Sequence, residues 1–113
     1  MNKYIFGAVL LISGSVSAAP LYCSGKVAGV YIQSNGDVNI NGSWRNTWTT
    51  ICNTKNSDTV MCPLWASYAA AAVQENLKVT LHYNVSDGST CSTLPTYATA
   101  PQPSYFLIHN PAM

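Results

Sequence analysis

Residues 27–40 read VAGVYIQSNGDVNI, two β-like runs on either side of a turn-forming segment. Each run carries two β-branched residues on one face: Val30 with Ile32, and Val38 with Ile40. A two-residue turn at Asn35-Gly36 would split these residues between the two faces of the hairpin. A three-residue loop at residues 35–37 pairs Ile32 with Ile40 and keeps the apolar faces together. We therefore predict a bulged hairpin in which Gly36 adopts a positive φ.

The rest of the chain adds three strands and one helix to this hairpin. Residues 48–53 and 105–109 are rich in apolar and β-branched residues and predict strands. Residues 63–76 predict a helix, because Pro63 suits a first helical position and no Gly or further Pro follows. Residues 77–83 alternate as a half-buried strand, with three residues outward: Lys78, Thr80 and His82. Because strands and helices do not alternate, this order predicts an α+β domain with an antiparallel sheet.

The first eighteen residues have the pattern of a secretory signal peptide. Lys3 supplies a positive start, residues 5–12 form an apolar run, and small residues lead up to Ala18. The apolar run is far shorter than the roughly 20 residues that a membrane-spanning helix needs. We expect cleavage after Ala18, so that residues 19–113 form a single exported domain, periplasmic or secreted.

Residues 19–113 carry as many positive as negative side chains. The positive residues are Lys26, Arg45, Lys55 and Lys78, and the negative ones are Asp37, Asp58, Glu75 and Asp87. A nucleic-acid partner is not expected, because binding phosphates requires clustered Lys and Arg. Binding to a membrane surface is not expected, since there is no basic amphipathic helix. Membrane insertion is not expected either, since no segment after residue 18 is long and apolar enough. A surface of Ser, Thr, Asn and Tyr suits a glycan or a protein partner. No cofactor is expected.

The four cysteines predict a disulfide framework, as an even number does in a small exported domain. Three pairings are possible. We favour Cys52–Cys62, which closes a short connection, together with Cys23–Cys91, which ties the start of the fold to a late, proline-rich loop. A structural zinc site is the rival interpretation, but no Cys-x-x-Cys is present and the spacings do not suit one.

Short blocks of sequence are spaced along residues 19–113: CSGKV at 23–27, WR at 44–45, ICN at 51–53, CPLW at 62–65, LPTY at 94–97 and APQPSY at 100–105. In these blocks the chain resembles small secreted proteins of gammaproteobacteria that have no established function. The resemblance covers nearly all of the expected mature chain. It implies no activity.

The order of the predicted elements supports a second, more distant resemblance. It comprises an early Gly-x-Val hairpin, a strand ending at Ile51-Cys52, a short link to Cys62, an aromatic-bearing helix and a strand at residues 79–83. In this order the chain resembles the pentameric, glycan-binding B subunits of bacterial toxins of the subtilase-cytotoxin and typhoid-toxin kind. The resemblance implies a small OB-like β-barrel or strongly curved sheet, with the helix between strands 3 and 4. Residues 94–105 depart from that family, and no sugar-binding residue is carried over from it.

Catalytic residues are few. His82 and His109, with Lys26 or Lys78, could act as the acid and base of a small secreted ribonuclease. We favour the plainer interpretation that both are ordinary surface or edge histidines on strands. The aspartates lie in turn-like segments, and no Gly-x-Ser-x-Gly motif is present. We therefore predict a protein that is not an enzyme, with a small secreted hydrolase as the outside alternative.

The aromatic residues provide the candidate binding site. Trp44 lies beside Arg45 in a polar stretch, and Tyr97 lies in a Pro/Thr/Ala loop. Exposed aromatic rings together with Arg commonly grip a ligand or a partner protein. The alternative for Trp44 is that it packs over a sheet edge or onto Trp48. The two helix aromatics are expected in the core: Trp65 and Tyr68.

The function predicted from these observations is that of a secreted or periplasmic binding module. The resemblance to toxin subunits makes a glycan the first candidate ligand and a homo-oligomer the candidate assembly. The candidate ligand-binding residues are Trp44, Arg45 and Tyr97. A periplasmic inhibitor or immunity protein is the alternative, because it suits the size and the disulfides equally well.

Overall fold

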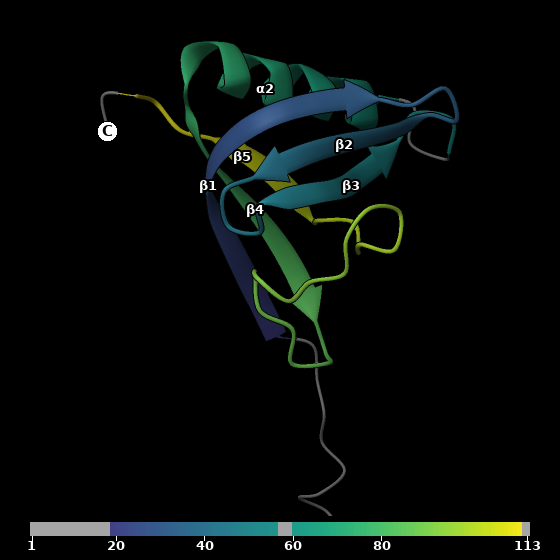
Figure 1. Cartoon of the computed structure of the whole chain (residues 1–113), viewed down its shortest axis with the longest axis vertical. Helices are drawn as coiled ribbons and strands as arrows, with labels where there is room; N and C mark the ends of the chain where they lie inside the picture. Colours follow the sequence, from purple (N-terminus) through teal and green to yellow (C-terminus); the bar gives the residue numbers. More distant parts are fainter. Residues whose placement is uncertain (1–18, 57–59, 112–113) are drawn as a thin grey trace, which may run out of the picture.

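The computed structural model describes residues 19–56 and 60–111, so the predicted signal segment at residues 1–18 lies outside the described part. The described residues form an antiparallel sheet, one helix and two disulfides, which confirms the α+β class (Figure 1). The elements are β1 (Ala19–Ile32), β2 (Asp37–Gly42), β3 (Thr47–Asn53), α2 (Met61–Glu75), β4 (Lys78–Val85) and β5 (Tyr105–Ile108). The helix lies between β3 and β4 in the chain, as predicted.

The sheet is built around β1, which pairs with a different neighbour along each half. Its first half, residues 19–26, is antiparallel to β4, and residues 27–32 are antiparallel to β2. Figure 1 shows β1 bending between these two halves. The strand order is β3-β2-β1-β4-β5, so the sheet is open and β3 and β5 form its edges. The first half of β1 was not predicted, since the hairpin pattern begins only at Val27.

The β1–β2 hairpin has the predicted loop length but a different register. The Gln33 carbonyl accepts from the Gly36 N–H at 2.9 Å, and the Gln33 N–H donates to the Asp37 carbonyl at 2.8 Å. The loop is therefore residues 34–36, and Ile32 pairs with Val38 instead of Ile40. Gly36 has the predicted positive φ of 98°. The shift follows from this φ, because a three-residue hairpin loop needs its left-handed residue in the last position.

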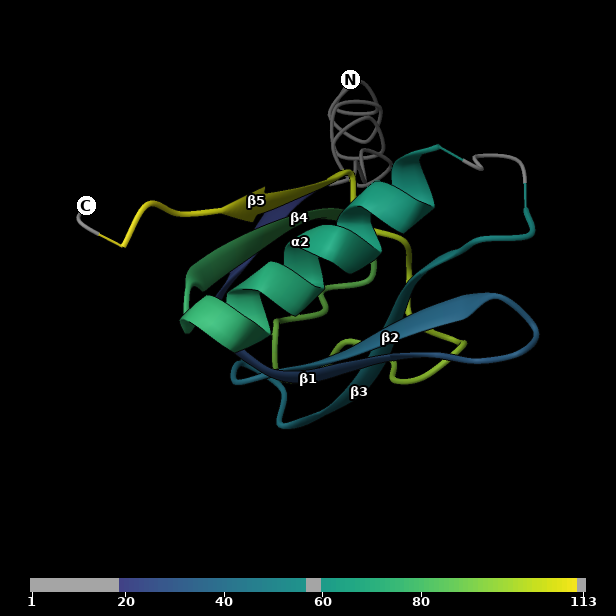
Figure 2. The same ribbon diagram turned by 90° about the horizontal axis from the view of Figure 1, so that it is seen from above.

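Helix α2 covers the inner face of the sheet (Figure 2). It starts at Met61, two residues before the predicted start, and Pro63 still lies in the first turn, where its missing N–H leaves no bond unmade. It ends where Asn76 turns left-handed and donates its N–H to the Ala72 carbonyl. Trp65 is buried as predicted, but Tyr68 is 40% exposed and contacts the core through the Phe106 ring, so its predicted place in the core was wrong. No helix in the described part has the length and hydropathy of a membrane span.

Both predicted disulfides are present. Cys23–Cys91 joins positions 68 residues apart, and Cys52–Cys62 joins positions 10 residues apart. All four cysteines are therefore oxidised, which excludes the zinc interpretation. Loop-closure entropy assigns the longer bridge about 4 kcal/mol of stabilisation and the shorter one about 3 kcal/mol. The longer bridge attaches the loop between β4 and β5 to the first half of β1.

The Trp44 side chain packs against the sheet where β1 changes its pairing partner from β4 to β2. Its ring lies directly on Gly42 and also contacts the position of Gly25, so that a Cβ on Gly42 would overlap the ring. The Ser43 N–H donates to the Lys26 carbonyl at 2.9 Å, and the Ser43 hydroxyl accepts from the Lys26 N–H at 3.1 Å. These contacts satisfy the backbone of β1 at the point where it leaves β2.

We predict that Gly42→Ala lowers the free energy of unfolding by about 1–3 kcal/mol, because the added methyl displaces the Trp44 ring. Urea denaturation of the oxidised protein measures this change. The same substitution in a Trp44→Ala background is expected to cost much less, since the overlap is then gone. An equal cost in both backgrounds would contradict the proposed overlap.

Candidate functional site

The face of the sheet that points away from α2 carries exposed aromatic rings next to polar side chains. Strand alternation buries Cys23, Leu81 and Phe106 on the inner face. The residues next to them in sequence therefore project from the opposite face of β1, β4 and β5. We call this surface the outer face, and it comprises Tyr22, Ser24, Lys26, Lys78, Thr80, His82, Tyr105, Leu107 and His109.

Three aromatic rings lie side by side across the outer face. Tyr22 pairs with His82 on the neighbouring strand, and His82 pairs with Tyr105 on the next one. The Tyr22 and His82 ring centroids are 4.9 Å apart with a tilt of 52°, and the His82 and Tyr105 rings are stacked at 5.1 Å and 6°. Tyr22 is 57% exposed and Tyr105 is 42% exposed. We call these three residues the aromatic row.

Tyr105 ends the row at the edge of the sheet. One face of its ring lies parallel to His82. Since β5 is an edge strand, no further strand of the described sheet lies beyond the other face of the ring. The His82 Nδ1 atom is buried and has no hydrogen-bond partner among the described residues. The row therefore combines two exposed tyrosine rings with an unsatisfied polar atom.

A chain of hydrogen bonds lies next to the aromatic row. The Ser24 and Thr80 hydroxyls are 2.7 Å apart, and the Thr80 hydroxyl is 2.8 Å from the His109 Nε2 atom. Thr80 is only 8% exposed because it lies between these two partners. The two histidines thus share the outer face but have different partners, His82 in the aromatic row and His109 in the hydroxyl chain. This relation depends on strand pairing and is not visible in the sequence.

The three residues predicted to bind a ligand, Trp44, Arg45 and Tyr97, each contact other parts of the domain. Trp44 is half-buried on Gly42, and the Arg45 Nε atom donates to the Leu94 carbonyl at 3.2 Å. Tyr97 has an exposed ring, at 50%, but its backbone is bonded to β3 on both sides. Its N–H donates to the Trp48 carbonyl at 2.9 Å, and its carbonyl accepts from the Thr50 N–H at 3.1 Å. Arg45 and Tyr97 thus help to attach the loop between β4 and β5 to the rest of the domain.

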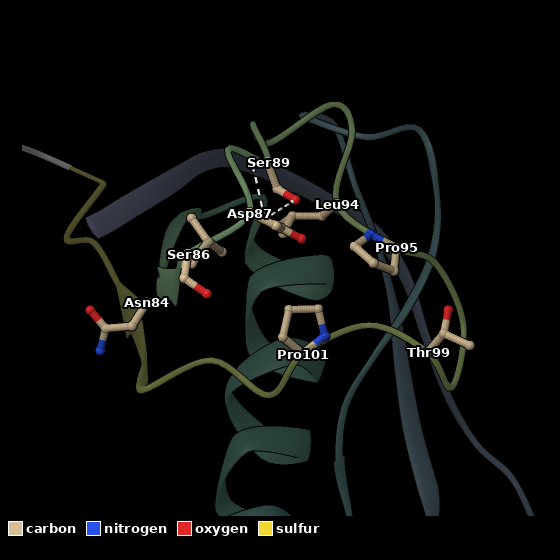
Figure 3. Close-up of a pocket in the computed structure, with 9 residues that line it drawn as sticks. Asn84, Ser86, Asp87, Ser89, Leu94, Pro95, Thr99 and Pro101 are labelled. Atoms are coloured by element: carbon tan, nitrogen blue, oxygen red, sulfur yellow. Dashed lines mark hydrogen bonds between the residues drawn. The ribbon is translucent and has the colours of Figure 1, made fainter. Parts of the chain in front are cut away.

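This loop also forms a small cavity of about 240 Å³ (Figure 3). Leu94, Pro95 and Pro101 supply apolar walls, and Asp87 and Ser89 supply polar groups. Ligand pockets usually measure about 300–1,000 Å³, so this cavity is at or below the lower limit. We therefore rank the outer face above it as the candidate site.

The pKa of Asp87, a polar residue of this cavity, is set by two hydrogen bonds from Ser89. The Ser89 hydroxyl donates to the Asp87 Oδ1 atom at 2.6 Å, and the Ser89 N–H donates to the same atom at 3.0 Å (Figure 3). These bonds, the hydroxyl first, hold the pKa of Asp87 below its ordinary value. A carboxyl with a lowered pKa adds stability above its unfolded-state pKa, and this stability is lost as the pH falls through the folded-state value.

We predict that Ser89→Ala raises the pKa of Asp87 toward its ordinary value, because the hydroxyl bond is removed while the N–H bond stays. An NMR pH titration of the Asp87 carboxyl carbon measures this change. Ser86→Ala is the matched control, since Ser86 lines the same cavity, and it is expected to leave the titration unchanged. Equal shifts in both variants would show that the hydroxyl bond is not the cause.

No family model, curated protein or solved structure matches this chain. The geometry of the outer face therefore provides the basis for a functional proposal.

Proposed function

We propose that the domain is an exported, non-enzymatic binding module that takes a glycan on the outer face, at the aromatic row. The observation that carries the proposal is the Tyr105 ring, which is stacked on His82 and is 42% exposed at the edge of the sheet. A sugar ring presents flat patches of C–H groups, and such patches stack on aromatic faces. A sugar on Tyr105 would extend the existing stack by one ring.

The polar groups beside the aromatic row suit the hydroxyls of a sugar. Ser24 is exposed, and its hydroxyl can donate or accept while it contacts Thr80. The row itself contains no Lys, Arg, Asp or Glu, as expected for a neutral polyol ligand. Binding sites are commonly built this way, with apolar rings for contact area and a few polar groups for orientation.

Two further features support the proposed location and fold. Two disulfides in a small domain are typical of oxidising compartments, which favours the periplasm or the extracellular space. The strand order β3-β2-β1-β4-β5, with a long bent β1 and a helix after β3, supports an OB-like sheet. In such a sheet the open edges, β3 and β5, would be the ones that approach each other.

The exposed side of α2 supports assembly into a homo-oligomer. Leu64 is 51% exposed and Tyr68 is 40% exposed, and their spacing of four residues places them on one face of the helix. A second copy of the chain could cover this apolar face. Several copies would present several aromatic rows, and multivalency strengthens the weak binding that single sugar sites provide.

We predict that Tyr105→Ala weakens glycan binding about tenfold or more, because truncating a central aromatic contact removes more than 1.4 kcal/mol of binding free energy. A glycan array identifies the best ligand, and calorimetric titration of the oxidised protein with that glycan measures the affinity. Tyr105→Phe keeps the ring and is expected to bind nearly as the unmodified chain does.

Tyr31→Ala is the matched control for this experiment. Tyr31 is also an exposed tyrosine of the sheet, but it packs on Trp48 in the other half. Its replacement is expected to leave the affinity unchanged. A loss in Tyr31→Ala as large as that in Tyr105→Ala, or no glycan binding at millimolar concentrations, would overturn the proposal and favour a protein ligand.

We predict that the oxidised domain is oligomeric and that Leu64→Glu lowers its solution mass toward that of a monomer, because the buried glutamate would lack a partner. Light scattering after size exclusion measures the mass. Gln74→Glu, which adds the same charge at another exposed position of α2, is the control and is expected to stay assembled. A monomeric unmodified chain would contradict the proposed assembly.

A further inference from the structure

A hollow of about 510 Å³ lies where the Lys26–Lys78 end of the outer face meets the C-terminal end of α2. It is bounded by the last turn of α2, the middle of β1, the first residue of β4 and the residues that follow β5. Its charged and titratable lining residues are Lys26, Lys78, Glu75 and His109. Its size falls within the usual range of ligand pockets, about 300–1,000 Å³. The hollow is separate from the aromatic row.

The two lysines of the hollow lie directly opposite each other. Lys26 of β1 pairs with Lys78 of β4 in the antiparallel ladder. Like charges at directly opposed positions of a sheet are destabilising. Residues 19–113 contain only four Lys and Arg residues, so half of them occupy this one cross-strand pair. A negatively charged ligand between the two ammonium groups would turn this repulsion into attraction.

His109 is held beside the lysines by two hydrogen bonds. The backbone N–H of His109 donates to the Lys78 carbonyl at 2.9 Å, which continues the β4–β5 pairing by one residue. Its Nε2 atom is 2.8 Å from the Thr80 hydroxyl, and Thr80 is in turn held by Ser24. Because the Nε2 atom is engaged with Thr80, Nδ1 is the ring nitrogen that is left to contact a ligand in the hollow.

Glu75 partly offsets the positive charge without cancelling it. One carboxylate lines the hollow together with two ammonium groups. The Lys26 Nζ atom donates to the Asn76 carbonyl at 2.6 Å, which uses one of its three donors at the negative end of the helix. Lys26 therefore has donors left for a ligand, and Lys78 supplies a second ammonium group.

From this arrangement we propose that the hollow binds a tetrahedral oxyanion, the phosphate or sulfate group of a small ligand. Lys26 of β1, Lys78 of β4 and His109 after β5 line the hollow together, and their two ammonium groups and imidazole ring match an anion with several acceptor oxygens. The rest of such a ligand would extend out of the hollow along the outer face. This site does not depend on the proposed glycan binding, because none of its lining residues belongs to the aromatic row.

The test is an NMR titration of the full oxidised domain with sodium phosphate and, separately, with sodium sulfate at constant ionic strength. Saturable shifts are expected at the amide signals of Lys78 and His109. Lys78→Gln is expected to weaken the anion affinity about tenfold or more, since it removes a charged hydrogen-bond donor. Lys78→Arg keeps the charge and is expected to retain binding, which separates a loss of binding from a loss of folding.

Lys55→Gln is the matched control, because it removes one positive charge from an exposed position in the turn after β3. Lys55→Gln is expected to bind the anions as the unmodified chain does. Tyr105→Ala is also expected to bind them normally, because its substitution affects only the proposed glycan site. Equal losses in Lys55→Gln and Lys78→Gln, or shifts that sodium chloride reproduces, would overturn the proposal. Galactose 6-phosphate and galactose 6-sulfate then separate the two sources, since they share one carrier and the tighter ester shows whether phosphorylated or sulfated ligands are preferred.

Discussion

The whole sheet depends on one strand, β1, because it is the one strand of the described residues that pairs with both halves. Residues 19–26 belong to the ladder with β4, and residues 27–32 belong to the ladder with β2. A strand that changes partners leaves backbone groups to satisfy at the change, and buried unpaired groups are costly. Ser43 pairs with both backbone groups of Lys26, and the Trp44 ring fills the space above Gly42. The short turn between β2 and β3 thus holds the two halves of the sheet together.

The same strand also supports the candidate site. Cys23 faces inward and is bonded to Cys91, while its neighbours Tyr22 and Ser24 face outward. The disulfide therefore anchors β1 directly behind the aromatic row and the hydroxyl chain. Side chains on paired strands are held more precisely than side chains on loops, and a site that is already ordered loses less entropy when it binds. The order of these paired strands favours the outer face over the loop cavity around Asp87 as the binding site.

The sequence predicted most of the fold, and where it failed the cause was physical. The hairpin, the helix and the strand at 77–83 have clear local patterns, and the even number of cysteines indicated two disulfides. The first half of β1 alternates too, with Leu21 and Cys23 inward, but Pro20 and Gly25 interrupt the pattern. The aromatic row could not be predicted, because Tyr22, His82 and Tyr105 are brought together only by strand pairing. Trp44 has a role in packing because two distant glycines meet beneath it.

The outer face changes in character over three successive cross-strand rows. The aromatic row is neutral, the next row contains Ser24 and Thr80, and the last contains the paired lysines Lys26 and Lys78. Successive rows on one face are two residues apart along each strand, so the first and third rows are separated by about 13 Å. Substitutions at that distance with no shared partner act almost independently. The aromatic end and the lysine end of the outer face can therefore be tested as two separate candidate sites, even if one elongated ligand were to contact both.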